Sequence, residues 1–303
     1  MKQILLSEYY AQWIKIYKEG AIRSVTLKKY YLALSWIRKL APNLFIHNLN
    51  RLIYQQLLND FAATHEKQTT MDFHRLLKPA IQDALDEGFI EKDPCRKVII
   101  KGKVPRPKKA KYLNQFELHS LLKTLKLGEK PNVDWMILLI AKTGMRFSEA
   151  AALTPADFDF SKQIVVVNKT WDYKEARDFQ PTKNKSSIRK IQIDWMISTQ
   201  FSALTKNLPA DQPIFIKENI YNSTVNDTLE RRCKQANVPI ISVHGLRHTH
   251  ASVLLYAGVS IASVAQRLGH SNMSTTQKVY LHIINELENK DIDLVMKSLS
   301  ALT

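Results

Sequence analysis

The sequence predicts a mainly α-helical protein with a small antiparallel β-sheet, built as two domains. Apolar residues recur at helical spacing through the first hundred residues and again after residue 222. Between these regions, two short segments rich in β-branched residues, 163–168 and 187–193, indicate strands. A basic segment with two prolines separates the halves, and its composition cannot form a core. At 303 residues, the chain is long enough for two such domains.

The first domain is predicted to be a small helical bundle. In "SEYYAQWIKIYKEG", Ser7 is the expected N-cap and Gly20 the expected stop. Further helices are expected at 26–40, 50–62 and 69–88. Pro79 lies inside the last of these and should kink it, because proline cannot donate to the carbonyl four residues earlier.

The segment "KGKVPRPKKAKY" marks the predicted domain boundary. It separates a first domain at 1–102 from a second at 113–303, with the linker itself at 103–112. Because the segment contains no Asp or Glu, it can be a solvated tether, and it can also lie along a phosphate backbone. The two interpretations are compatible. Its basic residues are the predicted DNA contacts: Lys101, Lys103, Arg106, Lys108, Lys109 and Lys111.

The second domain is predicted to alternate between helices and a short sheet. Asn114 and Glu117 have the spacing of a capping box, and the apolar helix "VDWMILLIAKTG" should end at Gly144. The polar segment "KTWDYKEARDFQPTKNKS" between the two predicted strands is expected to be mobile. After residue 222, helices continue to the end of the chain.

The charge of the chain points to a polyanionic partner. The net charge is +16, and residues 1–112 carry 21 Lys and Arg against 10 Asp and Glu. Nucleic acid is the expected partner, with an anionic membrane surface as the rival. No run of 18 apolar residues and no secretory signal is present, so a cytoplasmic location is expected. The two cysteines, Cys95 and Cys233, fall in different domains and are expected to stay reduced.

The stretch "VHGLRHTHAS" concentrates histidines and an arginine without an acid. His244 and His248 are four residues apart, as zinc ligands on a helix are, but the neighbourhood offers no Glu or Cys as a third ligand. No serine lies in a "GxSxG" turn, and no glycine-rich phosphate loop is present. Residues 242–282 contain no Asp or Glu at all. A site of this composition suits a group that gains negative charge as it reacts, such as a phosphodiester, without a metal or other cofactor.

Three motifs, "TGMRFSEAAAL", "HGLRHTHAS" and "LGHSNMSTTQKVYLH", occur in this order after a helical domain and a basic linker. Together they resemble the tyrosine recombinase (lambda-type phage integrase) family over essentially the whole chain. The resemblance implies a helical core-binding domain that contacts DNA, followed by an α+β catalytic domain with a C-terminal tail helix. Many members carry a further DNA-binding domain ahead of the core-binding one, so we expect this chain to be a short member or a truncated one.

The resemblance also implies the site residues. They are Arg146, Lys183, His244, Arg247, His270 and Tyr280. In this scheme Tyr280 is the nucleophile, the two arginines bind the scissile phosphate, and a hairpin lysine is the general acid. Lys185 remains the alternative to Lys183. Taken alone, Tyr280 would more often be a half-buried helix tyrosine, and Glu149 is expected to be a structural partner of the Arg146 turn.

The implied reaction is site-specific cleavage and rejoining of DNA through a 3′-phosphotyrosine. Its expected partners are double-stranded DNA attachment sites, further protomers in a tetramer on DNA, and accessory DNA-bending or excision proteins, with no membrane. The expected source is a phage or another mobile element. A dimer resolvase of the Xer type, a topoisomerase and a non-catalytic DNA-binding protein are the alternatives. His248, His250 and His282 match no catalytic position and are expected to have structural or DNA-backbone roles.

Overall fold

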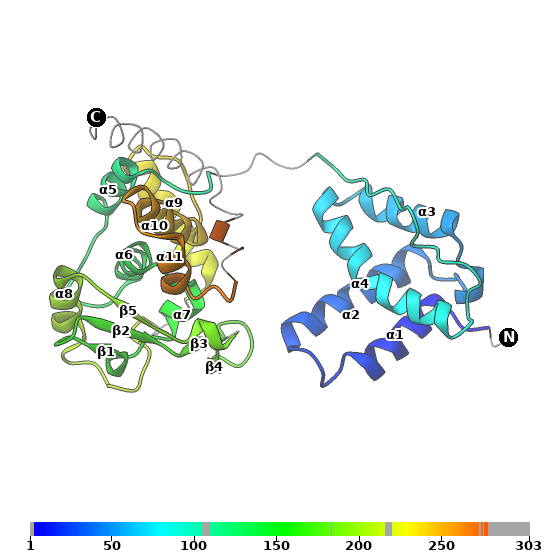
Figure 1. Ribbon diagram of the computed structural model, residues 1–303, viewed down its shortest axis with the longest axis horizontal. Coiled ribbons are helices and arrows are strands. Elements are labelled where there is room, and N and C mark those ends of the chain that lie inside the picture. The colour runs from blue at the N-terminus through cyan, green and yellow to red at the C-terminus, as the bar shows by residue number, and fades with distance from the viewer. Residues whose placement is uncertain are drawn as a thin grey trace, which may run out of the picture. The chain divides into compact units, whose positions relative to one another are not determined.

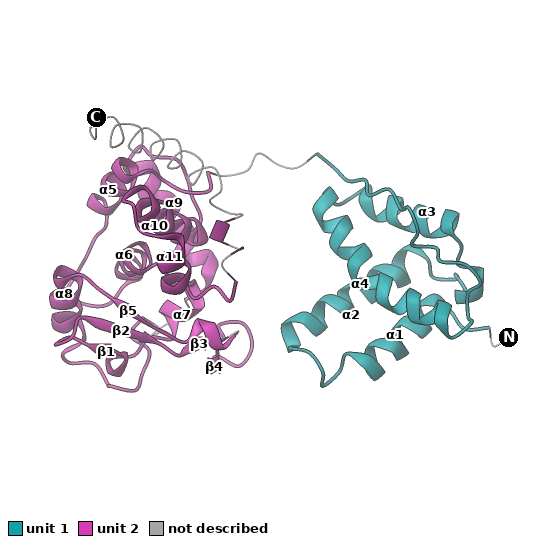
Figure 2. Ribbon diagram, viewed as in Figure 1, with its two compact units in different colours: residues 1–107 teal, residues 108–303 magenta. Residues whose placement is uncertain are grey.

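The computed structural model of the chain is mainly α-helical with a small antiparallel sheet (Figure 1), which confirms the predicted fold class. It describes residues 3–104, 110–182, 184–215, 220–272, 274, 276 and 277. The chain divides into two compact units, residues 1–107 and 108–303 (Figure 2). Each unit has a hydrophobic core of its own.

Unit 1 is a helical bundle. Its helices are α1 (Leu6–Tyr17), α2 (Ser24–Leu40), α3 (Arg51–Ala62) and α4 (Lys67–Asp86), with a 3-10 turn at Ile46–Asn48. Pro79 lies inside α4, which is assigned as one continuous helix. The large buried side chains Tyr10, Ile14, Ile37 and Tyr54 fill the space between the helices.

The predicted start of the first helix was wrong. Leu5, not Ser7, is the N-cap of α1, and Ser7 is buried within the first turn. The reason is a contact from far along the chain. Leu5 pairs with Phe45, and the backbone N–H of Leu6 donates to the carbonyl of Leu44 at 2.7 Å, so the helix begins two residues earlier than its capping signal indicates.

Unit 2 surrounds one central helix with further helices and two small sheets. Its helices are α5 (Gln115–Lys123), α6 (Val133–Thr143), α7 (Phe147–Ala151), α8 (Trp195–Thr205), α9 (Asn222–Gln235), α10 (Val243–Tyr256) and α11 (Ile261–Leu268), with 3-10 turns at Pro155–Asp157 and Lys185–Ser187. Its strands are β1 (Phe158–Asp159), β2 (Ile164–Val167), β3 (Lys169–Trp171), β4 (Phe179–Pro181) and β5 (Arg189–Gln192). As predicted, Asn114 and Glu117 cap each other at the start of α5.

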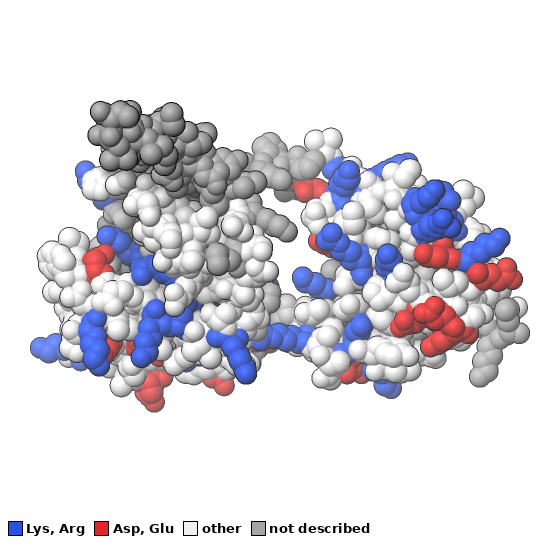
Figure 3. All heavy atoms as spheres, in the orientation of Figure 1, with Lys and Arg blue, Asp and Glu red and all other residues white. Residues whose placement is uncertain are grey.

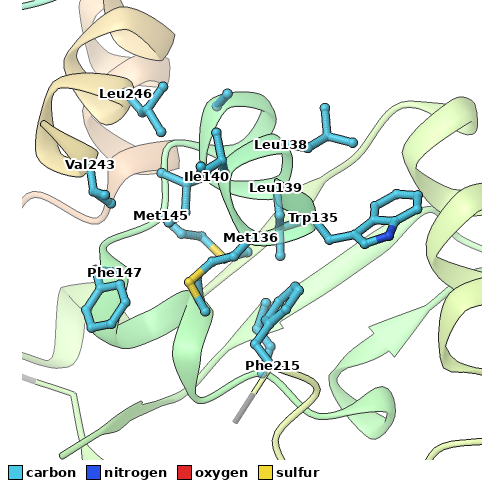
Figure 4. Packing of buried hydrophobic residues seen from close by; sticks show 14 of the residues in the cluster. Trp135, Met136, Leu138, Leu139, Ile140, Met145, Phe147, Phe215, Val243 and Leu246 are labelled. Atoms are coloured by element: carbon cyan, nitrogen blue, oxygen red, sulfur yellow. The ribbon is translucent and has the colours of Figure 1, made fainter. Parts of the chain in front are cut away.

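Helix α6 forms the centre of unit 2. It is apolar on nearly every face, as expected of a helix that is enclosed by others rather than lying on a surface. Figure 4 shows its side chains packed between those of Phe215 on one side and Val243 and Leu246 of α10 on the other. Met145 and Phe147 continue this packing just beyond the helix, so the turn between α6 and α7 is anchored on both sides of Arg146.

The main sheet has the strand order β1-β2-β5, all antiparallel. Strands β2 and β5 pair in a register that places Val167 opposite Arg189 and Val165 opposite Ile191. These four residues form the buried face of the pair, whereas Lys190 on the alternate face is exposed. An arginine therefore occupies a position where the strand alternation predicts an apolar residue.

The polar segment between the predicted strands is more ordered than expected. It contains β3 and β4, which pair as a separate two-stranded antiparallel hairpin. Trp171 and Phe179 face each other across the hairpin with their ring centroids 5.2 Å apart. This cross-strand aromatic pair stabilises strands whose other residues are mostly polar.

The turn at Gly144 generates the first prediction. Gly144 has φ +69°, and a Cβ there would lie 2.7 Å from His250 Cδ2 and 2.8 Å from a methyl carbon of Leu268. We expect Gly144→Ala to lower the free energy of unfolding by about 1 kcal/mol for the left-handed conformation and about 1–3 kcal/mol more for the clash. Urea denaturation measures the loss.

Gly258→Ala is the matched control, because Gly258 has φ +83° in the same unit but nothing within 4 Å of its Cβ position. This variant should show only the conformational cost. Equal losses for the two variants would mean that the close approach at Gly144 contributes nothing.

Candidate active site

Arg146 lies on the turn between α6 and α7, where the conformation of Gly144 reverses the chain. Its side chain is partly exposed, and its Nη1 donates to Oε1 of Glu149 at 2.7 Å. The other carboxylate oxygen of Glu149 accepts the backbone N–H of Arg146 at 2.9 Å. Glu149 thus holds both the backbone and the guanidinium of Arg146.

Glu149 is almost fully buried and has a second arginine partner. Its Oε2 accepts from Nη2 of Arg189 at 2.9 Å, and the side chains of Glu149 and Arg189 are 1% and 5% exposed. Burial by itself would raise the pKa of the Glu149 carboxyl, but the charges of Arg189 and Arg146 hold that pKa below its ordinary value. The carboxylate is therefore ionised, and it offsets part of the positive charge of the site.

Arg247 lies on α10 and is 2% exposed. Its Nη1 donates to the carbonyl of Gly144 at 2.7 Å, and its Nη2 donates to the carbonyl of Leu268 at 2.6 Å. These carbonyls end α6 and α11, two helices that are each followed by a glycine in the left-handed conformation. One guanidinium therefore joins the turn that carries Arg146 to the turn that carries His270.

The two predicted site histidines lie within the field of these arginines. Burial, followed by the charges of Arg247, Arg146 and Arg189, lowers the pKa of His270 to about 4. His244 is exposed on α10, but the protein around its ring and the charges of Arg247 and Arg146 also lower its pKa. The structure thus brings Arg146, His244, Arg247 and His270 together, with both imidazoles neutral near pH 7.

The position of His270 is set by its neighbours. Gly269, in the left-handed conformation, ends α11, and the Nδ1 of His270 shares a hydrogen bond of 2.7 Å with the hydroxyl of the buried Thr276. An open groove of about 980 Å³ runs beside the ring and is lined by Ser186, Arg189 and His270 among others. This groove opens the side of the site that carries His270 to solvent.

Two of the predicted site residues, Lys183 and Tyr280, lie outside the described residues, as do His282 and the predicted tail helix. The alternative lysine, Lys185, begins the 3-10 turn before β5 and is exposed. Arg106, Lys108 and Lys109 of the linker are also outside the described part of the chain, while Lys101, Lys103 and Lys111 are exposed. Lys and Arg side chains are exposed on both units in the face that Figure 3 shows.

Hydrogen bonds from the backbone fix the chain at both ends of the predicted linker. The backbone N–H of Lys103 donates to the carbonyl of His65 at 2.8 Å. At the other end, the N–H of Leu113 donates to the hydroxyl of Thr249 on α10 at 2.9 Å. The carbonyl of Lys111 lies 3.1 Å from where a Cβ on Gly245 would be, so the chain enters unit 2 against the helix that carries His244 and Arg247.

Other histidines of α10 have different surroundings. His250 is buried, shares a hydrogen bond with the carbonyl of Ala141 at 3.0 Å and accepts from Nε of Arg267 at 2.9 Å. These two bonds require the neutral ring, and burial followed by the charge of Arg267 lowers the pKa of His250 to about 3. Of the two expected roles, structural or DNA-backbone, these bonds favour the structural one for His250. His248 packs edge-on against His244, with their ring centroids 4.7 Å apart.

Sequence reasoning missed Arg189 and Arg267 as members of this region. A signal for Arg189 was present, because the alternation in "RKIQI" places it on the same face as Ile191 and Ile193. A charged residue on a predicted core face needs a buried partner. For Arg267 no comparable signal exists, since its position on α11 is compatible with an exposed arginine.

Within the described ranges, no three His, Cys, Asp or Glu side chains come together as metal ligands would. Among the helices of those ranges, none combines the length and the apolar character needed to cross a bilayer.

The family model described as "Phage integrase family" matches residues 111–286, more than half of the chain. The chain belongs to the phage integrase family. This membership confirms the resemblance that the three motifs indicated. The matched region spans all of the residues that the motifs single out, from Arg146 to Tyr280.

Individual relatives of this integrase-family chain come from several sources. It is 26% identical over 255 residues to a tyrosine recombinase XerC-like protein of Caldanaerobacter subterraneus subsp. tengcongensis, a match that covers 75% of this chain and 65% of the relative. It is also 26% identical over 281 residues to the prophage ps2 probable integrase of Lactococcus lactis, covering 83% and 72% of the two chains. The chain thus spans just under two thirds of the length of the XerC-like relative.

Among solved structures, the chain resembles the Tn1549 transposon integrase in complex with a circular intermediate DNA. The TM-score is 0.76 with 20% sequence identity, and the match covers 91% of this chain and 94% of the solved chain, which comprises residues 82–397 of the transposon integrase. The fold of this integrase-family chain is therefore that of the transposon integrase.

Three histidines with lowered pKa values generate a pH prediction. His248, His250 and His270 have pKa values near 4, 3 and 4 in the folded protein, below the ordinary value of about 6.5. Between pH 6.5 and 4 the unfolded chain binds protons that the folded chain does not. The free energy of unfolding should therefore fall as the pH falls through this range. Urea denaturation at a series of pH values measures it.

His250→Gln tests the largest of these contributions, because a glutamine amide can donate to Ala141 and accept from Arg267 but does not titrate. The variant should lose less stability than the wild type between pH 7 and pH 4. Comparison at pH 8, where the histidines are neutral in both states, gives the structural cost of the substitution. Identical pH profiles for the two proteins would contradict the assignment.

Proposed function

We propose that this chain is a site-specific DNA recombinase, an integrase of a phage or another mobile element. It cleaves and rejoins DNA strands through a 3′-phosphotyrosine intermediate. The observation that carries the proposal is that Arg146 and Arg247 lie beside the neutral imidazoles of His244 and His270 in one partly open, cationic site. Membership of the phage integrase family supports it.

In this proposal the two arginines bind the non-bridging oxygens of the scissile phosphate. The phosphorus gains negative charge as it becomes pentacoordinate, and a guanidinium offers paired N–H donors that match such oxygens. Both guanidiniums are already held by the protein, Arg146 by Glu149 and Arg247 by two backbone carbonyls. Little reorganisation is then needed when the charge develops, which is the condition for electrostatic catalysis.

In this proposal the histidines form hydrogen bonds to the phosphate and accept or donate protons. A neutral imidazole has one donor and one acceptor, and His270 already commits Nδ1 to Thr276. Its other nitrogen is available to the phosphate. A bound phosphodiester anion favours the protonated imidazole and so raises the pKa of His270 and His244 from their lowered values. DNA binding thus brings these groups nearer to the pH at which they exchange protons.

The nucleophile and the general acid in this scheme are Tyr280 and Lys183, with Lys185 as the alternative acid. A tyrosine hydroxyl has a pKa near 10, so only about one in a thousand is ionised at pH 7, and the cationic site favours that form. The phenol oxygen forms the new bond to phosphorus while the bond to the 5′-oxygen breaks, and the lysine protonates the leaving oxygen. The 5′-hydroxyl of a partner strand reverses the step, so no cofactor is consumed.

DNA recognition is assigned to the basic segments. Lys101, Lys103 and Lys111 are exposed, and we place them along the phosphate backbone together with Arg106, Lys108 and Lys109. Unit 1 is assigned to core-type DNA binding and the cytoplasm is the expected compartment. Exchange of two duplexes needs four such sites, so the active assembly is a tetramer on DNA, with accessory bending or excision proteins setting direction.

The XerC-like relative favours one further candidate, a resolvase of chromosome or plasmid dimers. It uses the same chemistry, so the site cannot distinguish the two. The topology of the products from a plasmid with two recombination sites does, and it also separates both from a topoisomerase, which would relax the plasmid without exchange.

A trapping experiment tests the reaction. Half-site duplexes with a randomised binding segment and a nick beside the scissile phosphate lose a short fragment on cleavage, so the covalent adduct accumulates. We expect the wild type to form adducts whose DNA can be sequenced, and Tyr280→Phe to bind the selected duplexes but form none. Adducts with the phenylalanine variant would refute the nucleophile, and inhibition by added chelator would contradict the metal-free chemistry.

Arg146→Ala tests the phosphate clamp. On the selected duplex, loss of one preorganised donor should slow adduct formation on the order of 100- to 1000-fold, with DNA affinity largely kept. Single-turnover gel assays and filter binding measure the two quantities. Arg247→Ala should slow the reaction as well, but it also leaves the carbonyls of Gly144 and Leu268 without their donor and should destabilise unit 2. An unchanged rate in Arg146→Ala would contradict the assigned role.

A further inference from the structure

Arg189 is a buried charge beside the site that the proposed chemistry leaves unused. It lies on the inward face of β5, opposite Val167 and in line with Ile191. Only 5% of its side chain is exposed. Burial of a guanidinium costs several kcal/mol unless it is paired and hydrogen-bonded, so its partners define what it does.

The three kinds of nitrogen in the guanidinium of Arg189 bond to three different segments. Nη2 donates to Oε2 of Glu149 on α7 at 2.9 Å. Nε donates to the carbonyl of Arg267 in the last turn of α11 at 2.6 Å. Nη1 donates to the carbonyl of Ser187, at the end of the 3-10 turn before β5, at 3.0 Å.

Each of these segments carries a residue of the proposed site. Glu149 holds Arg146, and His270 follows Arg267 by three residues. The segment that ends at Ser187 contains Lys185 and directly follows Lys183. The close packing extends to Gly269, where a Cβ would lie 3.1 Å from Nη1 of Arg189 and 3.1 Å from the carbonyl oxygen of Ser186. One planar group therefore spans the gap between three parts of the site.

Arg189 also decides how Glu149 acts on Arg146. The carboxylate divides its oxygens, with Oε1 bound to the Arg146 guanidinium and Oε2 to Arg189 and the Arg146 backbone. Without Arg189, Arg146 would be the remaining cation beside a buried carboxylate. The pair would then tighten, and the Arg146 guanidinium would be drawn away from a phosphate.

We propose that Arg189 is a positioning residue that sets the placement of Arg146, His270 and the hairpin lysine relative to one another. The inference rests on the proposed function. Arg189 does not touch the reacting phosphate and acts through Glu149 and through the two backbone carbonyls. Only a guanidinium can serve here, because it directs N–H groups to three acceptors in one plane, whereas an ammonium is a point charge on a flexible stem.

Arg189→Lys is therefore the informative variant, since it keeps a charge for Glu149 but cannot hold all three segments. On a duplex selected with the wild type, we expect its single-turnover rate of adduct formation at saturating DNA to fall by at least about tenfold. Its DNA affinity should stay within about twofold, because the phosphate contacts of the surface are unchanged. Melting temperature is measured alongside both quantities.

Arg232→Lys is the matched control. Arg232 on α9 forms a similarly buried ion pair with Asp134 at the start of α6 in the same unit, with 12% and 6% of the two side chains exposed. Arg232→Lys should lower the melting temperature about as much as Arg189→Lys does, without lowering the rate of adduct formation. If Arg189→Lys slows the reaction by less than about fivefold relative to Arg232→Lys, the positioning role is overturned.

A double substitution tests the route through Glu149. If Arg189 acts in part by binding one oxygen of that carboxylate, Arg189→Lys should slow adduct formation by a smaller factor in the Glu149→Gln variant than in the wild type. Fully additive losses would overturn this route. Failure of the proposed function gives a different result, since the wild type itself would then form no adduct with any duplex in the pool.

Discussion

The carbonyl end of α6 is the constraint on which the site depends. The last carbonyls of a helix have no partner within the helix, and this end is buried, so side chains must supply the donors. His250 bonds to Ala141, Arg267 to Lys142 and Arg247 to Gly144. All of these donors come from α10 and α11. The need to satisfy one buried helix end therefore draws both helices onto the turn that carries Arg146, and cations near a helix C-terminus are favoured by its dipole.

The same arrangement explains why so many cationic side chains lie together with one buried carboxylate among them. Glu149 neutralises part of the charge of Arg146 and Arg189, and the lowered pKa values of the histidines keep further positive charge out of the site. The remaining positive charge forms an electrostatic field that attracts an anion. Under the proposed function, stability and function oppose each other, because cations that are placed to bind a phosphate repel one another before it binds.

Periodicity and turn chemistry predicted much of the architecture. Helices were expected at 50–62 and at the segment that ends at Gly144, and the structure has them at Arg51–Ala62 and Val133–Thr143. The pattern failed where distant contacts decide, as at the start of α1 and in the hairpin of β3 and β4. The bonds of Arg189 could not be predicted either, because the alternation marks only that a charge is buried, not which partners it meets.

The sequence by itself indicated the class of chemistry that we propose. An arginine after a helix-ending glycine, a histidine and an arginine three residues apart, and a stretch without acids are local features that need no fold to recognise. The bond of Arg146 to Glu149 is local, and the sequence indicated it. The tertiary structure decided how Arg247 and Arg189 are held, because their bonds are mostly nonlocal. Arg247 reaches a carbonyl 103 residues away, and Arg189 reaches one that is 78 residues away. Such bonds depend on how the helices pack, and a local pattern in the sequence does not predict that packing.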